Sequence, residues 1–170
     1  ERLEVEIGLA DAYLQSRHYD EAISHYQSAL DLSSSLEQRI KLHQTLSAAY
    51  AAQNNLERAW THLEAALEIL SEGEIPATSV IRGRVFADCA QIEWRMGNRR
   101  RAELWAREAA AILEGTSEHN SLAASYQTLG QVYAMLGQHS LASSYNLRAT
   151  AHLRATGRLQ PESAPAPTTT

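Results

Sequence analysis

The stretch "QNNLERAWTHLEAAL", residues 53–67, decides the fold because three other segments of the chain can be laid over it. These segments are "SRHYDEAISHYQSAL" (16–30), "GNRRRAELWAREAAA" (97–111) and "GQHSLASSYNLRATA" (137–151). Each has an alanine at the same place and a second alanine seven residues later: Ala22 and Ala29, Ala59 and Ala66, Ala102 and Ala109, Ala142 and Ala149. Repetition of this kind indicates an array of small, similar units.

An amphipathic stretch precedes each of these segments. The four stretches are "EVEIGLADAYL", "KLHQTLSAAYA", "VFADCAQIEWRM" and "SYQTLGQVYAML". Their apolar residues recur at steps of three and four, which is typical of a helix with one buried face. The predicted unit is therefore a helix, a tight turn and a second helix. The paired alanines have a steric reason, because two antiparallel helices approach closely only where side chains are small.

The connections between helices carry their own signals. Gly97 and Gly137 follow the first helix of their units, where a left-handed residue ends a helix at little cost. The stretch "SSSLEQ" (33–38) offers two capping boxes for the next helix, Ser34 with Glu37 and Ser35 with Gln38. Pro76 favours a helix start in the long break at residues 71–79.

These features resemble the tetratricopeptide repeat family over residues 3 to about 155. The first unit matches through Leu9-Ala10, Tyr13, Tyr19, Ala22, Tyr26 and Ala29, and the fourth through Leu129-Gly130, Tyr133, Gly137, Ala142 and Ala149. The third is the weakest match, because Glu93 stands where the family has an aromatic residue. The resemblance implies an all-α fold, an α-α superhelix of about four hairpins.

The repeats depart from the common pattern in two ways. The closing proline is missing from every unit, and the spacing from alanine to alanine is 37, 43 and 40 residues rather than the roughly 34 of the common repeat. Such lengths are similar to the repeats of bacterial maltose-activator-type regulators and signal-transduction ATPases. We expect units at about 3–36, 37–75, 76–115 and 116–156 in one domain, 1–156. The Pro- and Thr-rich residues 157–170 are expected to be a disordered tail.

Composition narrows the functional classes. The chain has 170 residues, a net charge of −5 and one cysteine, so an internal disulfide framework is excluded. No apolar run approaches the roughly 18 residues that a membrane span needs, and we expect a cytoplasmic protein. Residues 1–75 carry 13 acidic residues and 5 Lys or Arg, whereas residues 76–170 carry 7 acidic residues and 10 Arg. The array is therefore predicted to have an acidic end and a basic end.

The resemblance implies a concave groove formed by the first helix of each unit, and with it a protein-interaction module that binds a peptide or a partner domain. Within such a module we expect the sensor or regulatory part of a larger bacterial signalling protein. The groove residues implied are Glu4, Asp11, Gln15, Lys41, Gln44, Arg84, Gln91, Trp94, Arg95, Gln127 and Gln131. Glutamine amides both donate to and accept from a peptide backbone. The alternative is that these are solvated residues on one face of a scaffold.

Catalytic motifs are not found. The sequence has no glycine-rich phosphate loop, no nucleophile elbow and no metal-ligand pair at helical spacing. The seven histidines are scattered along the chain and are expected on the surface or in hairpin packing. Cys89 lies on the packed face of a first helix and is expected in the core. The sequence therefore predicts no enzyme, no cofactor and no metal.

The run Arg99, Arg100 and Arg101 stands out in an acidic chain. It is interpreted as a solvated turn, with a basic docking edge for an acidic partner as the alternative. A nucleic-acid-associated repeat module is the other functional hypothesis. The acidic first half argues against it, because nucleic-acid affinity comes largely from phosphate neutralisation. Association of copies through the ends of the array is left open.

Overall fold

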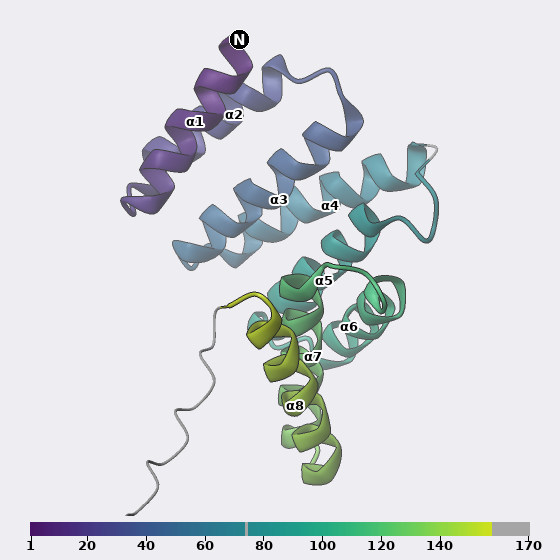
Figure 1. Ribbon diagram of the computed structural model, residues 1–170. Coiled ribbons are helices and arrows are strands. Elements are labelled where there is room, and N and C mark those ends of the chain that lie inside the picture. Colours follow the sequence, from purple (N-terminus) through teal and green to yellow (C-terminus); the bar gives the residue numbers. More distant parts are fainter. Residues whose placement is uncertain (74, 158–170) are drawn as a thin grey trace, which may run out of the picture.

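The structure, a computed structural model, describes residues 1–73 and 75–157. Eight helices follow one another: α1 (Arg2–Gln15), α2 (Tyr19–Leu32), α3 (Leu36–Ala52), α4 (Leu56–Glu72), α5 (Val80–Arg95), α6 (Arg99–Leu113), α7 (His119–Met135) and α8 (His139–Ala155). They form four antiparallel hairpins stacked one on the next (Figure 1). The all-α superhelix of hairpins is confirmed. Residues 158–170 of the expected tail lie outside the described part of the chain.

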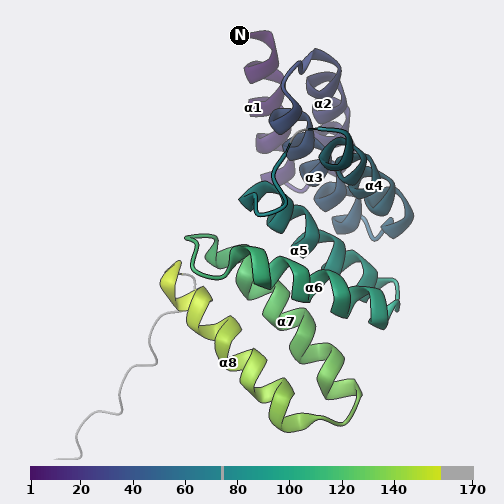
Figure 2. The same cartoon turned by 90° about the vertical axis from the view of Figure 1, so that its right-hand side faces the viewer.

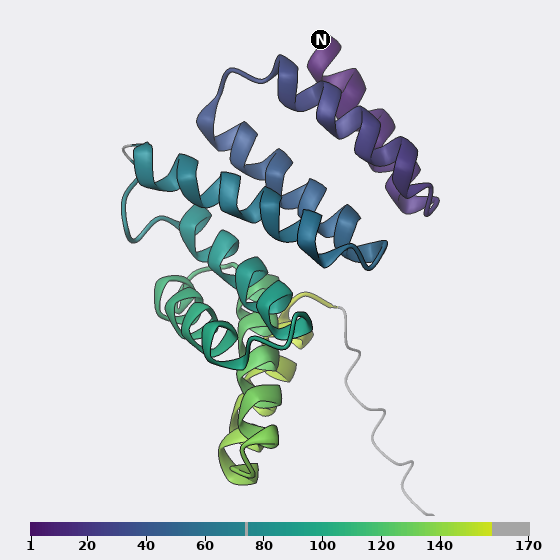
Figure 3. The same cartoon turned by 180° about the vertical axis from the view of Figure 1, so that it is seen from behind.

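The stack turns as it grows. Figures 2 and 3 show that each hairpin is rotated relative to the one before it, so that α7 and α8 run at a steep angle to α1 and α2. Each second helix packs on the first helix of the next unit, and α5 also contacts both α3 and α7. The first helices of the second, third and fourth units therefore lie side by side.

The paired alanines lie where the two helices of each hairpin meet. In the first three units the six alanines are fully buried, and Ala142 and Ala149 of the fourth unit are 4% and 2% exposed. The small side chain at these positions allows the close approach that the repeat pattern predicted. The core is otherwise built from tyrosine and aliphatic side chains such as Tyr26, Leu46 and Leu63.

The turns confirm the predicted chemistry. Gly97 and Gly137 adopt φ values of +84° and +74°, in the left-handed region that glycine enters without strain. The same turn in the first two units is made by Arg17 and Asn54, with φ values of 60° and 61°. Asparagine tolerates this conformation better than arginine.

Two local predictions have different outcomes. The capping box of Ser35 with Gln38 does not form, because the Ser35 side chain at the start of α3 caps no backbone N–H. Pro76 does mark a break between two helices, since α4 ends at Glu72 and α5 begins at Val80. The new helix begins four residues after the proline, where the Ser79 hydroxyl accepts a hydrogen bond from Ile81 N–H.

A stacking side chain repeats in three of the four hairpins. Tyr13 stacks on His25 and Tyr50 on His62, with ring centroids 5.4 and 5.3 Å apart. Tyr133 stacks on Tyr145 in the fourth hairpin. The third hairpin has Glu93 in place of the tyrosine, so its carboxylate lies in a site that is otherwise aromatic.

A glycine on α5 sets how closely α6 approaches. A Cβ added at Gly83 would lie 2.6 Å from two atoms of Leu113, which is fully buried. We expect Gly83→Ala to lower the free energy of unfolding by about 1–3 kcal/mol through overpacking, as measured by urea denaturation. The matched control is Gly130→Ala, where the new Cβ meets the side chain of Asn146, which is exposed and can move. Equal losses in the two variants would contradict this explanation.

Candidate functional site: a groove along three first helices

Three adjoining pockets run along α3, α5 and α7. Their volumes are about 490, 310 and 250 Å³. The first and second pockets share Gln44, and the second and third share Gln91 and Arg95. Because neighbouring pockets have common walls, we treat them as one surface and call it the α3–α5–α7 groove.

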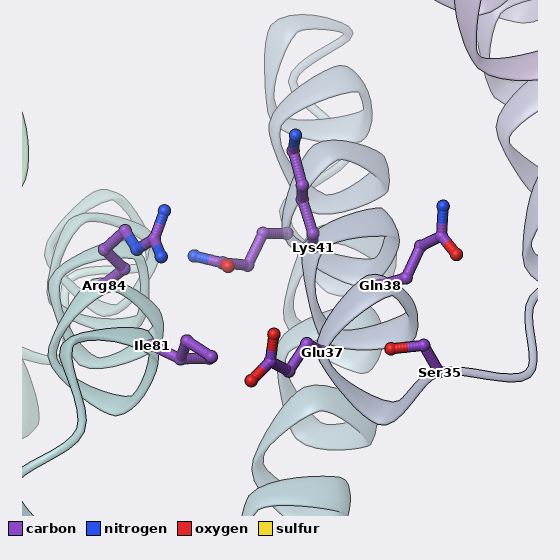
Figure 4. Close-up of a pocket in the computed structure, with 7 residues that line it drawn as sticks. Ser35, Glu37, Gln38, Lys41, Ile81 and Arg84 are labelled. Atoms are coloured by element: carbon purple, nitrogen blue, oxygen red, sulfur yellow. The ribbon is translucent and has the colours of Figure 1, made fainter. Parts of the chain in front are cut away.

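The first pocket lies between the start of α3 and α5, and its charged groups have both signs (Figure 4). Lys41 and Glu37 come from α3, and Arg84 faces them from α5. Arg84 Nε lies 3.8 Å from the Glu118 carboxylate, and this side-chain pair is only partly exposed. Ser35 and the amides of Gln38 and Gln44 complete the wall. The pocket therefore offers cations, hydrogen-bond donors and hydrogen-bond acceptors within one space.

Asp88 also lines the second pocket, and the sequence did not predict it as a groove residue. Gln44 Nε2 donates to Asp88 Oδ2 at 2.6 Å, which joins α3 to α5 across 44 residues. Burial raises the pKa of Asp88 to about 6, although the hydrogen bond from Gln44 and the charge of Arg84 oppose this. The family pattern assigns Asp88 to no inward position, so the only sequence signal was a lone acid on a packed helix.

Arg95 lies where the second and third pockets meet. Its Nη2 donates to the Ala51 carbonyl oxygen at 2.9 Å and to Asn54 Oδ1 at 3.2 Å. These acceptors lie at the end of α3, where backbone carbonyl groups lack helical partners. Arg95 therefore holds α3 and α5 together as well as lining the groove.

The third pocket contains Trp94, the only tryptophan among the residues that line the three pockets. It is partly buried and shares the pocket with Gln91 of its own helix and with Gln127 and Gln131 of α7. A large aromatic ring beside several amides combines apolar area with hydrogen-bonding groups. This end of the groove can hold an apolar side chain and the backbone next to it.

Eight of the eleven predicted groove residues line these pockets: Lys41, Gln44, Arg84, Gln91, Trp94, Arg95, Gln127 and Gln131. The other three, Glu4, Asp11 and Gln15, lie on α1 and line none of the three. Asp11 accepts a hydrogen bond from the Tyr26 hydroxyl. Burial, together with the neighbouring Asp11 carboxylate, raises the pKa of Tyr26.

The three arginines at the start of α6 do not all behave as a solvated turn, because the Arg101 side chain makes contacts within the described array and those of Arg99 and Arg100 form no ion pair there. The interpretation of the whole run as a solvated turn is therefore corrected for Arg101. Arg101 Nη2 lies 2.8 Å from Glu93 Oε1, and its guanidinium stands 4.9 Å from the centre of the Trp60 ring. Arg101 thus bridges the second and third hairpins. Arg99 and Arg100, at the start of α6, are exposed.

Four of the seven histidines form two pairs that the sequence did not predict. His43 Nδ1 lies 3.1 Å from His62 Nδ1, and His119 Nδ1 lies 3.0 Å from His152 Nδ1. Each pair joins the two helices of one hairpin. Their partners are 19 and 33 residues apart in sequence, so no helical spacing could have revealed them.

Cys89 is fully buried, as predicted. Burial, together with the charges of Asp88 and Glu93, raises the pKa of its thiol, which disfavours the thiolate. Within residues 1–73 and 75–157, no group of three or more His, Cys, Asp or Glu side chains is placed to hold a metal ion. None of the described helices is long and apolar enough to cross a membrane.

A known family model matches the first hairpin of the array. The family model of the tetratricopeptide repeat matches residues 7–35, which span most of the first hairpin. Residues 7–35 thus resemble a tetratricopeptide repeat. Three further hairpins with the same buried alanines follow it, so the array has the fold of tetratricopeptide-repeat proteins.

Solved structures show the same fold over nearly the whole chain. BtubC (BKLC) from P. vanneervenii is 21% identical with a TM-score of 0.74, over 99% of this chain and 69% of that one. TPR-like repeats of a Podosopora anserina protein, named as those of a kinesin light chain, are 23% identical with a TM-score of 0.72, over 91% and 76%. MamA is 16% identical with a TM-score of 0.66, over 92% and 81%. No curated protein matches the chain.

The tetratricopeptide repeat generally forms non-catalytic scaffolds that mediate contacts between proteins.

Proposed function

We propose that this tetratricopeptide-repeat array is a non-catalytic interaction module that binds an extended protein segment in the α3–α5–α7 groove. The observation that carries the proposal is the continuity of the groove. Its three pockets share walls, and amide side chains recur along it at Gln44, Gln91, Gln127 and Gln131. An extended backbone presents N–H and C=O groups at regular intervals, and amides can pair with both.

The two ends of the groove suit different side chains of the bound segment. Trp94 provides an aromatic surface in the third pocket, of the kind that dominates interface energies. Lys41 and Arg84 face Glu37 in the first pocket, so that end suits polar side chains. Glu4, Asp11 and Gln15 of α1 are proposed to contact parts of the partner that extend past the first pocket.

The proposed setting is cytoplasmic, in the sensor or regulatory part of a larger bacterial signalling or transcription-regulatory protein. The support is the repeat spacing of 37, 43 and 40 residues, which is similar to such regulators, and the lone reduced cysteine, which fits a reducing compartment. We propose that residues 1–156 act as one repeat domain and that residues 157–170 serve as a tail.

A nucleic-acid partner has less support. Four of the arginines stand over aromatic rings of the array itself: Arg58 over Tyr50, Arg101 over Trp60, Arg107 over Tyr133 and Arg148 over Tyr126. Arg99 and Arg100 are the members of the basic run that neither pair with a carboxylate nor stand over an aromatic ring among the described residues. Two neighbouring cations are a weak basis for the phosphate neutralisation on which nucleic-acid affinity depends.

The groove can be tested with segments selected for binding. A random peptide library displayed on phage supplies binders of the full chain, and isothermal titration measures them against variants. Trp94→Ala should weaken binding about 30-fold, as expected for an aromatic anchor worth about 2 kcal/mol, with an unchanged far-UV spectrum. The matched control is Leu104→Ala, which removes a 58%-exposed side chain from α6 and should leave the affinity unchanged. Selected peptides indifferent to Trp94, Gln91 and Arg84 would refute the groove as the binding site.

A further inference from the structure

A further pocket opens from the α3–α5–α7 groove between α5 and α7. Its volume is about 300 Å³, and it shares Gln91, Ala124 and Gln127 with the third pocket, which contains Trp94. Asp88 lines this pocket as well as the second one, and we call it the Asp88 pocket. Because it is continuous with the groove, a side chain of a segment bound in the groove can enter it.

The Asp88 carboxylate is the only charged group among the side chains that line this pocket. The other polar side chains there are neutral, and they belong to Gln91, Asn120, Ser121 and Gln127. Their amide and hydroxyl oxygens accept hydrogen bonds. The first three pockets, by contrast, each contain at least one Lys or Arg. The Asp88 pocket is therefore an acceptor site with one negative charge.

Asp88 has no counter-ion of its own. Arg84 lies one turn earlier on α5, but its Nε also lies 3.8 Å from the Glu118 carboxylate, so two acids share one arginine. Burial raises the pKa of Asp88, and the hydrogen bond from Gln44 and the charge of Arg84 oppose this only in part. The negative charge of Asp88 is thus incompletely compensated within the chain.

The other positive or titratable groups beside the pocket are engaged elsewhere. Arg95 donates to the Ala51 carbonyl oxygen. The start of α7 carries a partial positive charge, which Glu118 at its N-cap offsets. His119 and His152 contact each other through their Nδ1 atoms, and burial lowers the pKa of His152, which favours its neutral form. A cation that enters the pocket therefore meets an excess of negative charge.

We propose that the Asp88 pocket receives a basic side chain, lysine or arginine, of the segment bound in the groove. This inference rests on the proposed function and specifies which segments the groove selects. Asp88 and Trp94 are six residues apart on α5, a rise of about 9 Å, which an extended chain covers in about three residues. The preferred segment therefore has a basic residue and a large apolar residue about two to four positions apart.

The selection of displayed peptides also tests this inference. Peptides that bind the full chain should be enriched in Lys or Arg about two to four positions from an aromatic or large aliphatic residue. Replacing that lysine with norleucine, or that arginine with citrulline, removes the charge and should weaken binding about tenfold or more. Asp88→Asn should weaken binding of the basic peptide equally and leave that of the uncharged peptide unchanged, as measured by isothermal titration. The asparagine keeps a side-chain oxygen that can accept from Gln44.

Glu37→Gln is the matched control, because it removes the same charge from the first pocket of the same groove. It should leave the difference between the basic and the uncharged peptide as it is in the parent chain. Peptides that depend on Trp94 but carry no basic residue, or that bind Asp88→Asn as tightly as the parent, would overturn this inference and leave the groove as the binding site. A basic preference lost in Glu37→Gln and kept in Asp88→Asn would overturn it too, because the cation would then lie in the first pocket. Peptides indifferent to the whole groove would refute the proposed function, and this inference with it.

Discussion

The Arg101→Ala variant should unfold with a free energy about 2 kcal/mol below that of the parent chain, since it leaves a buried carboxylate without its counter-ion. Glu93 is 1% exposed, and Arg101 Nη2 lies 2.8 Å from its Oε1. Breaking a fully buried pair costs about 3–5 kcal/mol. The expected loss is smaller because the Arg101 side chain is 56% exposed and Asn98 Nδ2 still donates to the other Glu93 oxygen at 2.7 Å.

The neighbouring arginines are matched controls for this result. Arg99→Ala and Arg100→Ala remove the same charge from the same helix end, and each should change the free energy of unfolding by less than about 0.5 kcal/mol. Urea denaturation at pH 7 measures all three. Adding Glu93→Gln to Arg101→Ala should recover part of the loss, because the amide is neutral and leaves no buried charge. Three equal losses would show that Arg101 has no structural role beyond that of its neighbours.

Acid should destabilise the second hairpin through His43 and His62. His43 is 7% exposed, and burial, followed by the charges of His62 and Arg39, lowers its pKa to about 4. Burial and the charge of Arg58 lower the pKa of His62 as well. The ring nitrogens 3.1 Å apart need one donor and one acceptor, and protonation of both rings removes the acceptor.

The direction in which stability changes with pH follows from proton uptake by the two states of the chain. The pKa of each histidine is lower in the folded chain than in the unfolded chain, so between about pH 6.5 and pH 4 the unfolded chain binds more protons. The stability contributed by the pair is complete above about pH 7 and is lost as the pH falls toward 4. We expect a loss of about 2–3 kcal/mol over this range, measured by urea denaturation at several pH values.

The third hairpin supplies the control for this experiment. It has Phe86 and Trp105 at the positions of His43 and His62, with ring centroids 4.9 Å apart. The double variant His43→Phe/His62→Trp copies that pair and should lack the histidine part of the acid loss. Asp88, with its pKa raised to about 6, acts in the opposite direction, but it is present in both proteins and cancels in the difference. If the free energy of unfolding fell in parallel with pH in the two proteins, the acid loss could not be assigned to His43 and His62.

Much of the groove could be predicted because repeat phase fixes which face of a helix points inward. Once Ala10, Ser47, Ala90 and Gly130 are aligned, residues one position later fall on the same side, and Gln91 and Gln131 do line the pockets. Asp88 was not predicted as a groove residue, because whether it lines the groove depends on the distance between α3 and α5. Arg95 was placed in the groove, but its bond to the Ala51 carbonyl oxygen depends on where α3 ends in space.

The chain alone specifies eight helices, their pairing into hairpins and the left-handed turns at Gly97 and Gly137. These features depend on residues less than about one repeat apart, where helical periodicity and glycine geometry act. Tertiary structure decides which charges are neutralised and which distant residues meet. It brings Arg101 to Trp60 and Glu93, and it pairs His43 with His62. Such contacts depend on the angle and distance between packed helices. Many side chains together determine that angle and distance, so the contacts cannot be derived from the sequence spacing of two residues.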